Sequence, residues 1–109
     1  MTPRARVTHK VKCWPEFFQP MLNGLKRFDL RRDDRPEGFQ VGDQLLEQEW
    51  DPKLVSGYDE AMTAMEALQK GYTGREVLVR VDYIMPAHIV AKLMGKVTQF
   101  VIMSVSRVN

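Results

Sequence analysis

The sequence predicts an α+β protein in which about five short strands form a curled sheet or small barrel, with short helices beside it. Three observations lead to this prediction. The expected elements follow the order strand, helix, strand, strand, helix, strand, strand. The strands are short and closely spaced. The chain has 109 residues, enough for one modest core, so we expect a single domain over residues 1–109.

The first predicted strand runs from His9 to Trp14, where the residues alternate between two faces. A helix should then begin at Pro15 and Glu16, because proline is tolerated in the first turn and an acid there suits the helix dipole. Pro20 removes one helical hydrogen bond, so we expect a kink there or two successive short turns. Gly24 should end the helix.

The second predicted strand, Lys26 to Arg31, follows this glycine. We expect Phe28 and Leu30 to point inward, because alternate residues of a strand share a face. The same alternation would place Arg27, Asp29 and Arg31 on the opposite face.

A loop over residues 32–40 and a third strand over residues 41–51 are predicted next. The loop contains Pro36 and Gly38, which break regular structure. The strand should begin with a turn or bulge at Gly42-Asp43. Its apolar content is Leu45, Leu46 and Trp50.

Residues 53–71 have a different pattern. Residues 56–59 are typical of a turn and helix cap, and a helical spacing of apolar residues continues to Gly71. That stripe consists of Ala61, Met62, Met65 and Leu68. We interpret its methionines as packing residues.

The last third of the chain contains the clearest strand. Residues 72–75 are expected to form a turn, and residues 76–84 a strand. One face of that strand carries Val77, Val79, Val81 and Tyr83. Residues 85–95 form a connection with helical spacing from His88 to Met94, and residues 97–108 form a closing strand.

The charge of the chain is concentrated in one segment. Between Gly24 and Arg35 there are five basic residues and three acids, and this difference of two equals the net charge of the chain, +2. So small a net charge does not suit a protein that coats duplex DNA. The segment is either a local anion-binding surface or a solvated loop in which the charges pair with one another.

The composition also restricts location and chemistry. No run of about 18 apolar residues is present, so we expect no membrane span. The charged N-terminus does not resemble a secretory signal, and Cys13 is the single cysteine, so we expect a cytoplasmic protein with Cys13 buried. Neither metal-ligand spacing nor a phosphate-binding glycine loop is found, and we expect no metal and no cofactor.

What remains is a surface for anions and bases. Arginine guanidinium groups match phosphate oxygens in pairs. Trp14, Phe39 and Tyr72 could stack on bases. Trp14 and Phe39 could equally be core residues.

Several motifs follow one another along nearly the whole chain. The segment 9–18 reads HKVKCWPEFF, residues 24–31 read GLKRFDLR, residues 32–35 read RDDR, and residues 39–43 read FQVGD. Further matches lie at residues 49–52, 72–75, 81–84 and 100–104. In this order the motifs resemble the ASCH family of the PUA-like superfamily, and more closely a small bacterial and phage ASCH-like subgroup of unknown function. Residues 24–31 are similar to the signature GxKxxExR of that family.

The resemblance implies a PUA-like pseudo-β-barrel that binds RNA or nucleotides in a cleft along the signature strand. One branch of the family consists of amidohydrolases that deacylate a modified cytidine nucleoside with a lysine, a threonine and a downstream glutamate. Lys26 matches the lysine, but Asp29 occupies the position of the threonine. No acid follows Ile84 in the next loop. Compared with the subgroup, residues 53–71 could be a helical insertion that covers the cleft.

Three functions are therefore expected as alternatives. The first is an RNA- or nucleotide-binding module whose contacts come from Lys12, Lys26, Arg31, Arg32, Arg35, Tyr72 and Arg75. The second is an amidohydrolase acting on a modified nucleoside, with Lys26 and either Asp29 or Glu49 as catalytic residues. The third is a protein-interaction domain that docks a partner around Met62 and Met65. The oligomeric state is left open.

Overall fold

The computed structural model describes residues 4–55 and 64–108, and their strands form one five-stranded sheet in the order β1-β3-β4-β5-β2. The strands are β1 (Thr8–Cys13), β2 (Phe28–Arg32), β3 (Gln44–Trp50), β4 (Tyr72–Met85) and β5 (Phe100–Arg107). The helices are α1 (Pro15–Leu22), the short 3-10 helix η1 (Pro52–Val55), α2 (Ala64–Gln69) and α3 (Ala87–Met94).

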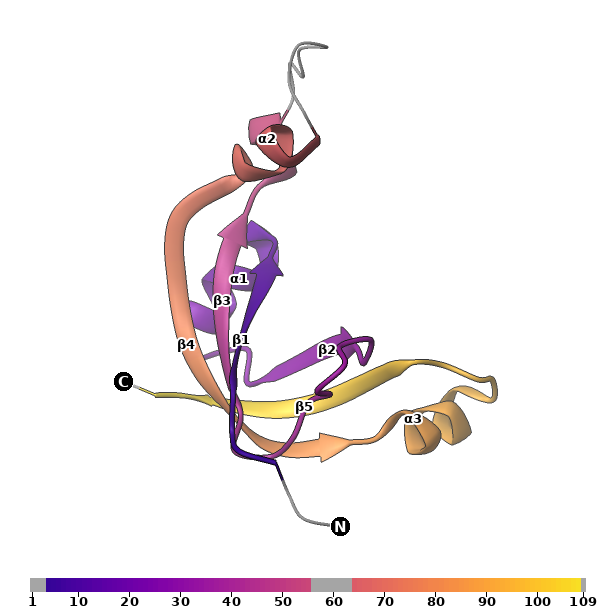
Figure 1. Cartoon of the computed structure of the whole chain (residues 1–109). Coiled ribbons are helices and arrows are strands. Elements are labelled where there is room, and N and C mark those ends of the chain that lie inside the picture. Colours follow the sequence, from indigo (N-terminus) through magenta and orange to yellow (C-terminus); the bar gives the residue numbers. More distant parts are fainter. Residues whose placement is uncertain (1–3, 56–63, 109) are drawn as a thin grey trace.

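The sheet curls around β4, the longest strand. β1 pairs in parallel with β3, and the other neighbours are antiparallel. β4 bends along its length. Its first half lies with β3 and β1, and its second half lies with β5 and β2. The two halves of the sheet therefore run in different directions (Figure 1). The result is a half-barrel with β1 and β2 as its edge strands. The predicted α+β pseudo-barrel with flanking helices is thus confirmed.

A β-bulge in β4 changes which residues face inward. The pairing with β5 shifts register between Val81 and Tyr83. Val77, Val79 and Val81 are buried as expected, whereas Tyr83 is 60% exposed. The extra residue of the bulge explains why the predicted alternation fails at Tyr83.

Several element boundaries differ from the prediction; for example, β2 begins at Phe28 and β3 at Gln44. Residues 72–75 are the start of β4, because Tyr72 pairs with Trp50 of β3, so the predicted turn is wrong. One helix runs through Pro20, so the alternative of two successive turns is wrong. β5 begins at Phe100, and Val97 is exposed. The helix expected at residues 88–94 and the turn at Gly42-Asp43 are confirmed. Met62 and the turn expected at residues 56–59 lie outside the described residues.

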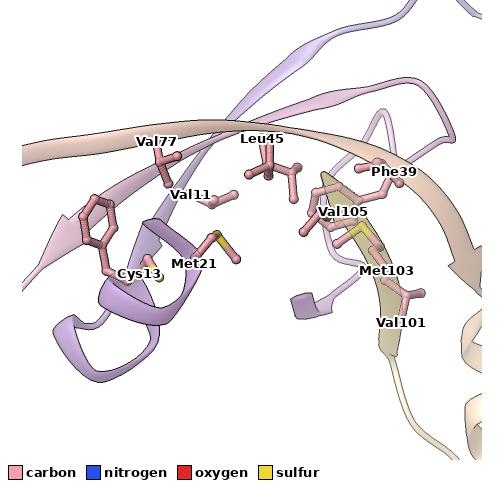
Figure 2. Packing of buried hydrophobic residues seen from close by; sticks show 12 residues of the cluster. Val11, Cys13, Met21, Phe39, Leu45, Val77, Val101, Met103 and Val105 are labelled. Atoms are coloured by element: carbon pink, nitrogen blue, oxygen red, sulfur yellow. The ribbon is translucent and has the colours of Figure 1, made fainter. Parts of the chain in front are cut away.

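The core lies on the concave side of the sheet. α1 contributes Phe18 and Met21, which are almost completely buried. Figure 2 shows Met21 close to Val11 and Cys13 at one end of the core, with Phe39, Val105 and Met103 at the other. Burial of these side chains away from water is the main stabilising term for such a domain. α1 is further fixed to β5, because Arg107 donates to the carbonyl of Leu22.

Asp43 joins the N-terminal segment to the turn before β3. It is completely buried, and its carboxylate accepts hydrogen bonds from Arg4 at 2.7 and 2.9 Å, from His9 Nε2 at 2.9 Å, and from the backbone amides of Val7 and Gln40. Burial alone would raise the pKa of Asp43, but the hydrogen bonds from Arg4, His9 and the two amides hold it well below its usual range.

Asp43→Asn should destabilise the protein by about 1–3 kcal/mol at pH 7, because an amide nitrogen cannot accept from the donors around it. The wild type should also lose stability progressively below about pH 4, the ordinary pKa of an aspartate. In that range the unfolded chain takes up a proton at Asp43, whereas the folded protein resists doing so. The variant should lose less over that range. Urea unfolding at pH 2–7 measures both effects, with exposed Asp34→Asn as the control. Equal acid dependence in wild type and Asp43→Asn would contradict the assignment.

Candidate functional site

Asp29 and Arg31 of β2 face the interior of the half-barrel, and Phe28 and Leu30 face outward, which is the reverse of the prediction. Asp29 is 4% exposed, whereas Phe28 and Leu30 are 53% and 52% exposed. The reason is the register with β5, in which Asp29 lies opposite Met103 and shares its buried face. The predicted orientation assumed that the apolar face of a strand turns inward. Here the inward face of the edge strand is stabilised by ion pairs instead.

These ion pairs connect β2 to β3. Arg31 Nε donates to Asp29 Oδ2 at 3.1 Å, and Arg31 Nη2 donates to Glu47 Oε1 at 2.9 Å. Lys26 Nζ lies 3.9 Å from Asp29 Oδ1 and donates to the carbonyl of Phe28 at 2.7 Å. Lys26, Asp29, Arg31 and Glu47 therefore form one cluster, which we call the β2 ion cluster. The structure brings together Lys26, Asp29 and Arg31 as candidate site residues and adds Glu47 to them.

The surroundings of Glu47 favour its protonated form. It is completely buried, and in the described part of the chain its Oε2 has no hydrogen-bond partner. Burial, followed by a hydrogen bond with Asp29 and the negative charge of Asp29, raises the pKa of Glu47 to about 8, although Arg31 and Lys26 act in the opposite direction. A proton on Glu47 can be donated to Asp29, which removes the repulsion between the two carboxyl groups. With Glu47 neutral, the β2 ion cluster carries a net positive charge.

A hollow of about 720 Å³ opens beside this cluster, between the two edge strands. We call it the edge cleft. It is lined by Lys12, Cys13, Trp14, Phe17, Lys26, Phe28, Asp29, Leu30, Arg31 and Phe100. Its aromatic side chains are largely exposed: Trp14 by 49%, Phe17 by 50%, Phe28 by 53% and Phe100 by 36%. Lys26 Nζ lies 4.8 Å from the ring centre of Phe28, so the aromatic wall and the cations adjoin.

A second hollow, of about 580 Å³, lies next to the first, and Lys12 lines both. We call it the side groove. It is lined by Lys10, Lys12, Arg35, Gln48, Glu49, Gln69, Tyr72, Gly74, Arg75 and Glu76. Lys12, Arg35, Tyr72 and Arg75 were predicted to bind nucleic acid, and the structure gathers them here. Arg32 lines neither hollow and lies over the ring of Phe100.

Arg75 is engaged in an ion pair that fixes one wall of the side groove. Glu49 accepts from Arg75 Nε at 3.0 Å, from Arg75 Nη2 at 3.1 Å and from the hydroxyl of Thr73 at 2.7 Å. The hydrogen bond from Arg75, assisted by Thr73 and opposed by desolvation, lowers the pKa of Glu49. Glu49, one of the two candidate acid partners of Lys26, is thus ionised and paired with Arg75. It lines the side groove, whereas Lys26 lines the edge cleft.

The remaining candidates are also placed. Trp14 lies at the edge cleft rather than in the core, whereas Phe39 is buried and packs edge-on against His9. Cys13 is buried as predicted, and burial raises the pKa of its thiol to about 12, so it is not a thiolate nucleophile at neutral pH. Met65 is exposed. Among the described residues, no three histidine, cysteine, aspartate or glutamate side chains are grouped to hold a metal ion.

Glu47 is the site residue that sequence analysis missed. Leu45, Glu47 and Glu49 occupy alternate positions, and all three are buried on the same face of β3. The signal was present in the sequence, since the alternation that places Leu45 inward also places these two glutamates inward. The two adjacent leucines at residues 45 and 46 obscured it, because they suggested apolar content on both faces.

Residues 8–105 match the family described as a domain of unknown function, DUF3850. The match covers most of the chain, and the protein belongs to this family. No curated protein matches the chain. None of the helices that the structure describes is long and apolar enough to cross a membrane.

Glu47→Gln should remove one component of the pH dependence of stability. A carboxyl group whose pKa is higher in the folded than in the unfolded protein stabilises the fold when the pH is below its unfolded-state pKa, 4.5 for a glutamate. This stabilisation is lost as the pH rises to about 8. The glutamine can still accept from Arg31 and donate to Asp29. The variant should therefore gain on the order of 2–4 kcal/mol over the wild type between pH 5 and pH 9.

Urea unfolding of both proteins at pH 5, 7 and 9 measures this gain. Exposed Glu76→Gln is the matched control and should run parallel to the wild type. If Glu47→Gln also ran parallel to the wild type, Glu47 would be ionised throughout, and the proton assigned to it would be absent.

Proposed function

We propose that the protein binds single-stranded RNA or a nucleotide in the edge cleft. The observation that carries the proposal is the combination of exposed aromatic rings with partly buried, positively charged groups in one hollow. Stacking on an aromatic side chain contributes about 1–3 kcal/mol per base and requires an unpaired base with accessible faces. The volume of about 720 Å³ lies within the range of small-ligand sites and suits one nucleotide.

The charges of the cleft favour an anionic ligand. Lys26 and Arg31 supply two positive charges, and Asp29 supplies one negative charge when Glu47 is neutral. Arg31 uses Nε and Nη2 within the β2 ion cluster, so its other guanidinium nitrogen, Nη1, is left to donate to a phosphate or a base. Because the carboxylates fix the guanidinium plane, little side-chain entropy is lost on binding.

The resemblance to the ASCH family supports the same proposal, because its signature strand corresponds to residues 24–31, and β2 with Lys26 forms one wall of the edge cleft. The small net charge of +2 argues against a long duplex as ligand, since affinity for duplexes depends on many phosphate contacts.

A second candidate, an amidohydrolase acting on a modified nucleoside, is favoured by Glu47. A protonated buried carboxyl group beside Asp29, with Lys26 3.9 Å from Asp29, is an arrangement suited to acid–base catalysis. In the amidohydrolases that the chain resembles, a threonine carries the hydroxyl group, and Asp29 occupies that position here. Turnover of acylated cytidine nucleosides by the wild type, lost in Lys26→Ala, would favour this candidate. No turnover across a panel of acylated nucleosides would leave binding as the function.

Lys26→Ala and Trp14→Ala should each weaken binding of a short single-stranded RNA. The first removes a cation of the cleft, and the second removes a stacking ring worth about 1–3 kcal/mol, which corresponds to roughly 5- to 150-fold in affinity. Fluorescence anisotropy with a labelled oligoadenylate measures both. Exposed Lys96→Ala, which lines neither hollow, is the control. Unchanged affinity in both cleft variants would place the site elsewhere.

Affinity should also fall as the pH rises through about 8. Ionisation of Glu47 adds a negative charge to the β2 ion cluster and lowers the attraction for phosphate. Oligoadenylate is a suitable probe because its bases do not titrate between pH 6 and pH 9. Glu47→Gln should flatten the dependence, and a wild-type affinity constant over this range would contradict the role of Glu47.

A further inference from the structure

We propose that the side groove binds the sugar–phosphate backbone adjoining a base held in the edge cleft, so that the ligand is a single-stranded oligonucleotide rather than a mononucleotide. This inference rests on the proposed function of the edge cleft and goes beyond it by assigning a second subsite and a ligand class.

The first argument is continuity. Lys12 lines both hollows, so a chain leaving the edge cleft meets it before it enters the side groove. Lys10 and Lys12 lie two residues apart on the exposed face of β1, which separates them by about 6.8 Å along the strand. That separation is comparable with the distance between consecutive phosphates of an extended single strand. Two neighbouring phosphates could therefore each contact one lysine.

The second argument is charge. The side groove contains four cationic side chains and two carboxylates. Glu49 is neutralised by Arg75, and Glu76 lies 3.5 Å from the side-chain amide of Gln48. No ion pair formed by the described residues involves Lys10 or Lys12. Lys12 Nζ lies 4.7 Å from the ring centre of Trp50, a contact that leaves its charge without a carboxylate. Both ammonium groups can therefore neutralise phosphates.

The third argument is the contrast between the hollows. Four aromatic side chains line the edge cleft, which suits a base, whereas the side groove has Tyr72 among mostly charged and amide side chains. A polar groove whose lysines form no ion pair with the described carboxylates suits the phosphates and sugars that connect one base to the next. The groove lies beside the cleft along β1, so the two subsites are in series.

The test compares ligands of different length by isothermal titration calorimetry. Adenosine monophosphate, the dinucleotide and the tetranucleotide of adenosine are titrated into the full chain at two salt concentrations. The wild type should bind the tetranucleotide much more tightly than the monophosphate, and Lys10→Ala should weaken tetranucleotide binding several-fold. For this variant the slope of log affinity against log salt should fall by about 0.7, the value for one phosphate contact to a single strand.

The variants Lys26→Ala and Lys10→Ala together separate the two subsites. Lys26→Ala should weaken binding of every ligand, whereas Lys10→Ala should leave the monophosphate affinity unchanged. Lys10→Ala is suited to this comparison because Arg35 bonds to the backbone carbonyl of residue 10, which the substitution retains. Lys96→Ala should change nothing.

The outcomes distinguish the two proposals. If the monophosphate binds in a Lys26-dependent manner but the tetranucleotide binds no more tightly, the subsite in the side groove is refuted while the proposed function stands. The same holds if Lys10→Ala affects no ligand. If the wild type binds none of the ligands, the proposed function fails, and the second subsite fails with it.

Discussion

The hydrogen bond from Arg31 to Glu47 is the interaction on which the shape of the candidate site depends. β2 and β3 are not neighbours in the sheet, and Arg31 connects them with a hydrogen bond of 2.9 Å to a completely buried carboxyl group. β2 is an edge strand whose backbone pairs only with β5. Without this hydrogen bond, β2 would be held in the sheet by its pairing with β5 alone. A buried contact between a guanidinium and a carboxyl group adds little net stability, because desolvation offsets the attraction, but it fixes geometry.

A proton on Glu47 would reconcile burial with charge. With that proton, two cations, one carboxylate and one neutral carboxyl group form a cluster that keeps a net positive charge beside the cleft. Were Glu47 ionised, its Oε2 would be a buried anionic oxygen without a donor, next to the carboxylate of Asp29. Protonation avoids that arrangement. The same cluster therefore organises the fold locally and sets the charge that a ligand meets.

The open half-barrel leaves two edges, and the protein uses them differently. β1 presents lysines at residues 10 and 12 on its exposed face, and charged residues of this kind also protect an edge strand from pairing with another chain. β2 presents Phe28 and Leu30 outward and holds Asp29 and Arg31 inward. The edge cleft lies between these unlike edges, which is why aromatic and cationic side chains meet there.

Much of the fold follows from period-two alternation in the sequence. β1, the valine face of β4 and the helix α3 were predicted because local pattern and tertiary burial agree there. The orientation of β2 was predicted wrongly because an ion-paired interior reverses the usual relation between polarity and burial. The bulge after Val81 and the pairing of Tyr72 with Trp50 depend on the partner strand, which the local sequence does not reveal. The predicted cations other than Arg32 line two adjoining hollows, but Glu47 emerged only from the structure.

The most direct test is to map the binding surface by nuclear magnetic resonance, titrating the isotope-labelled chain with single-stranded tetra-adenylate. The account predicts that amide shifts change in residues 10–17 and 26–31, which border the edge cleft and the side groove. Residues 87–96, on and after α3, should be unaffected. Shifts confined to α3, or no shifts at all at saturating ligand, would contradict the claim that the open edge of the half-barrel is a nucleic-acid site.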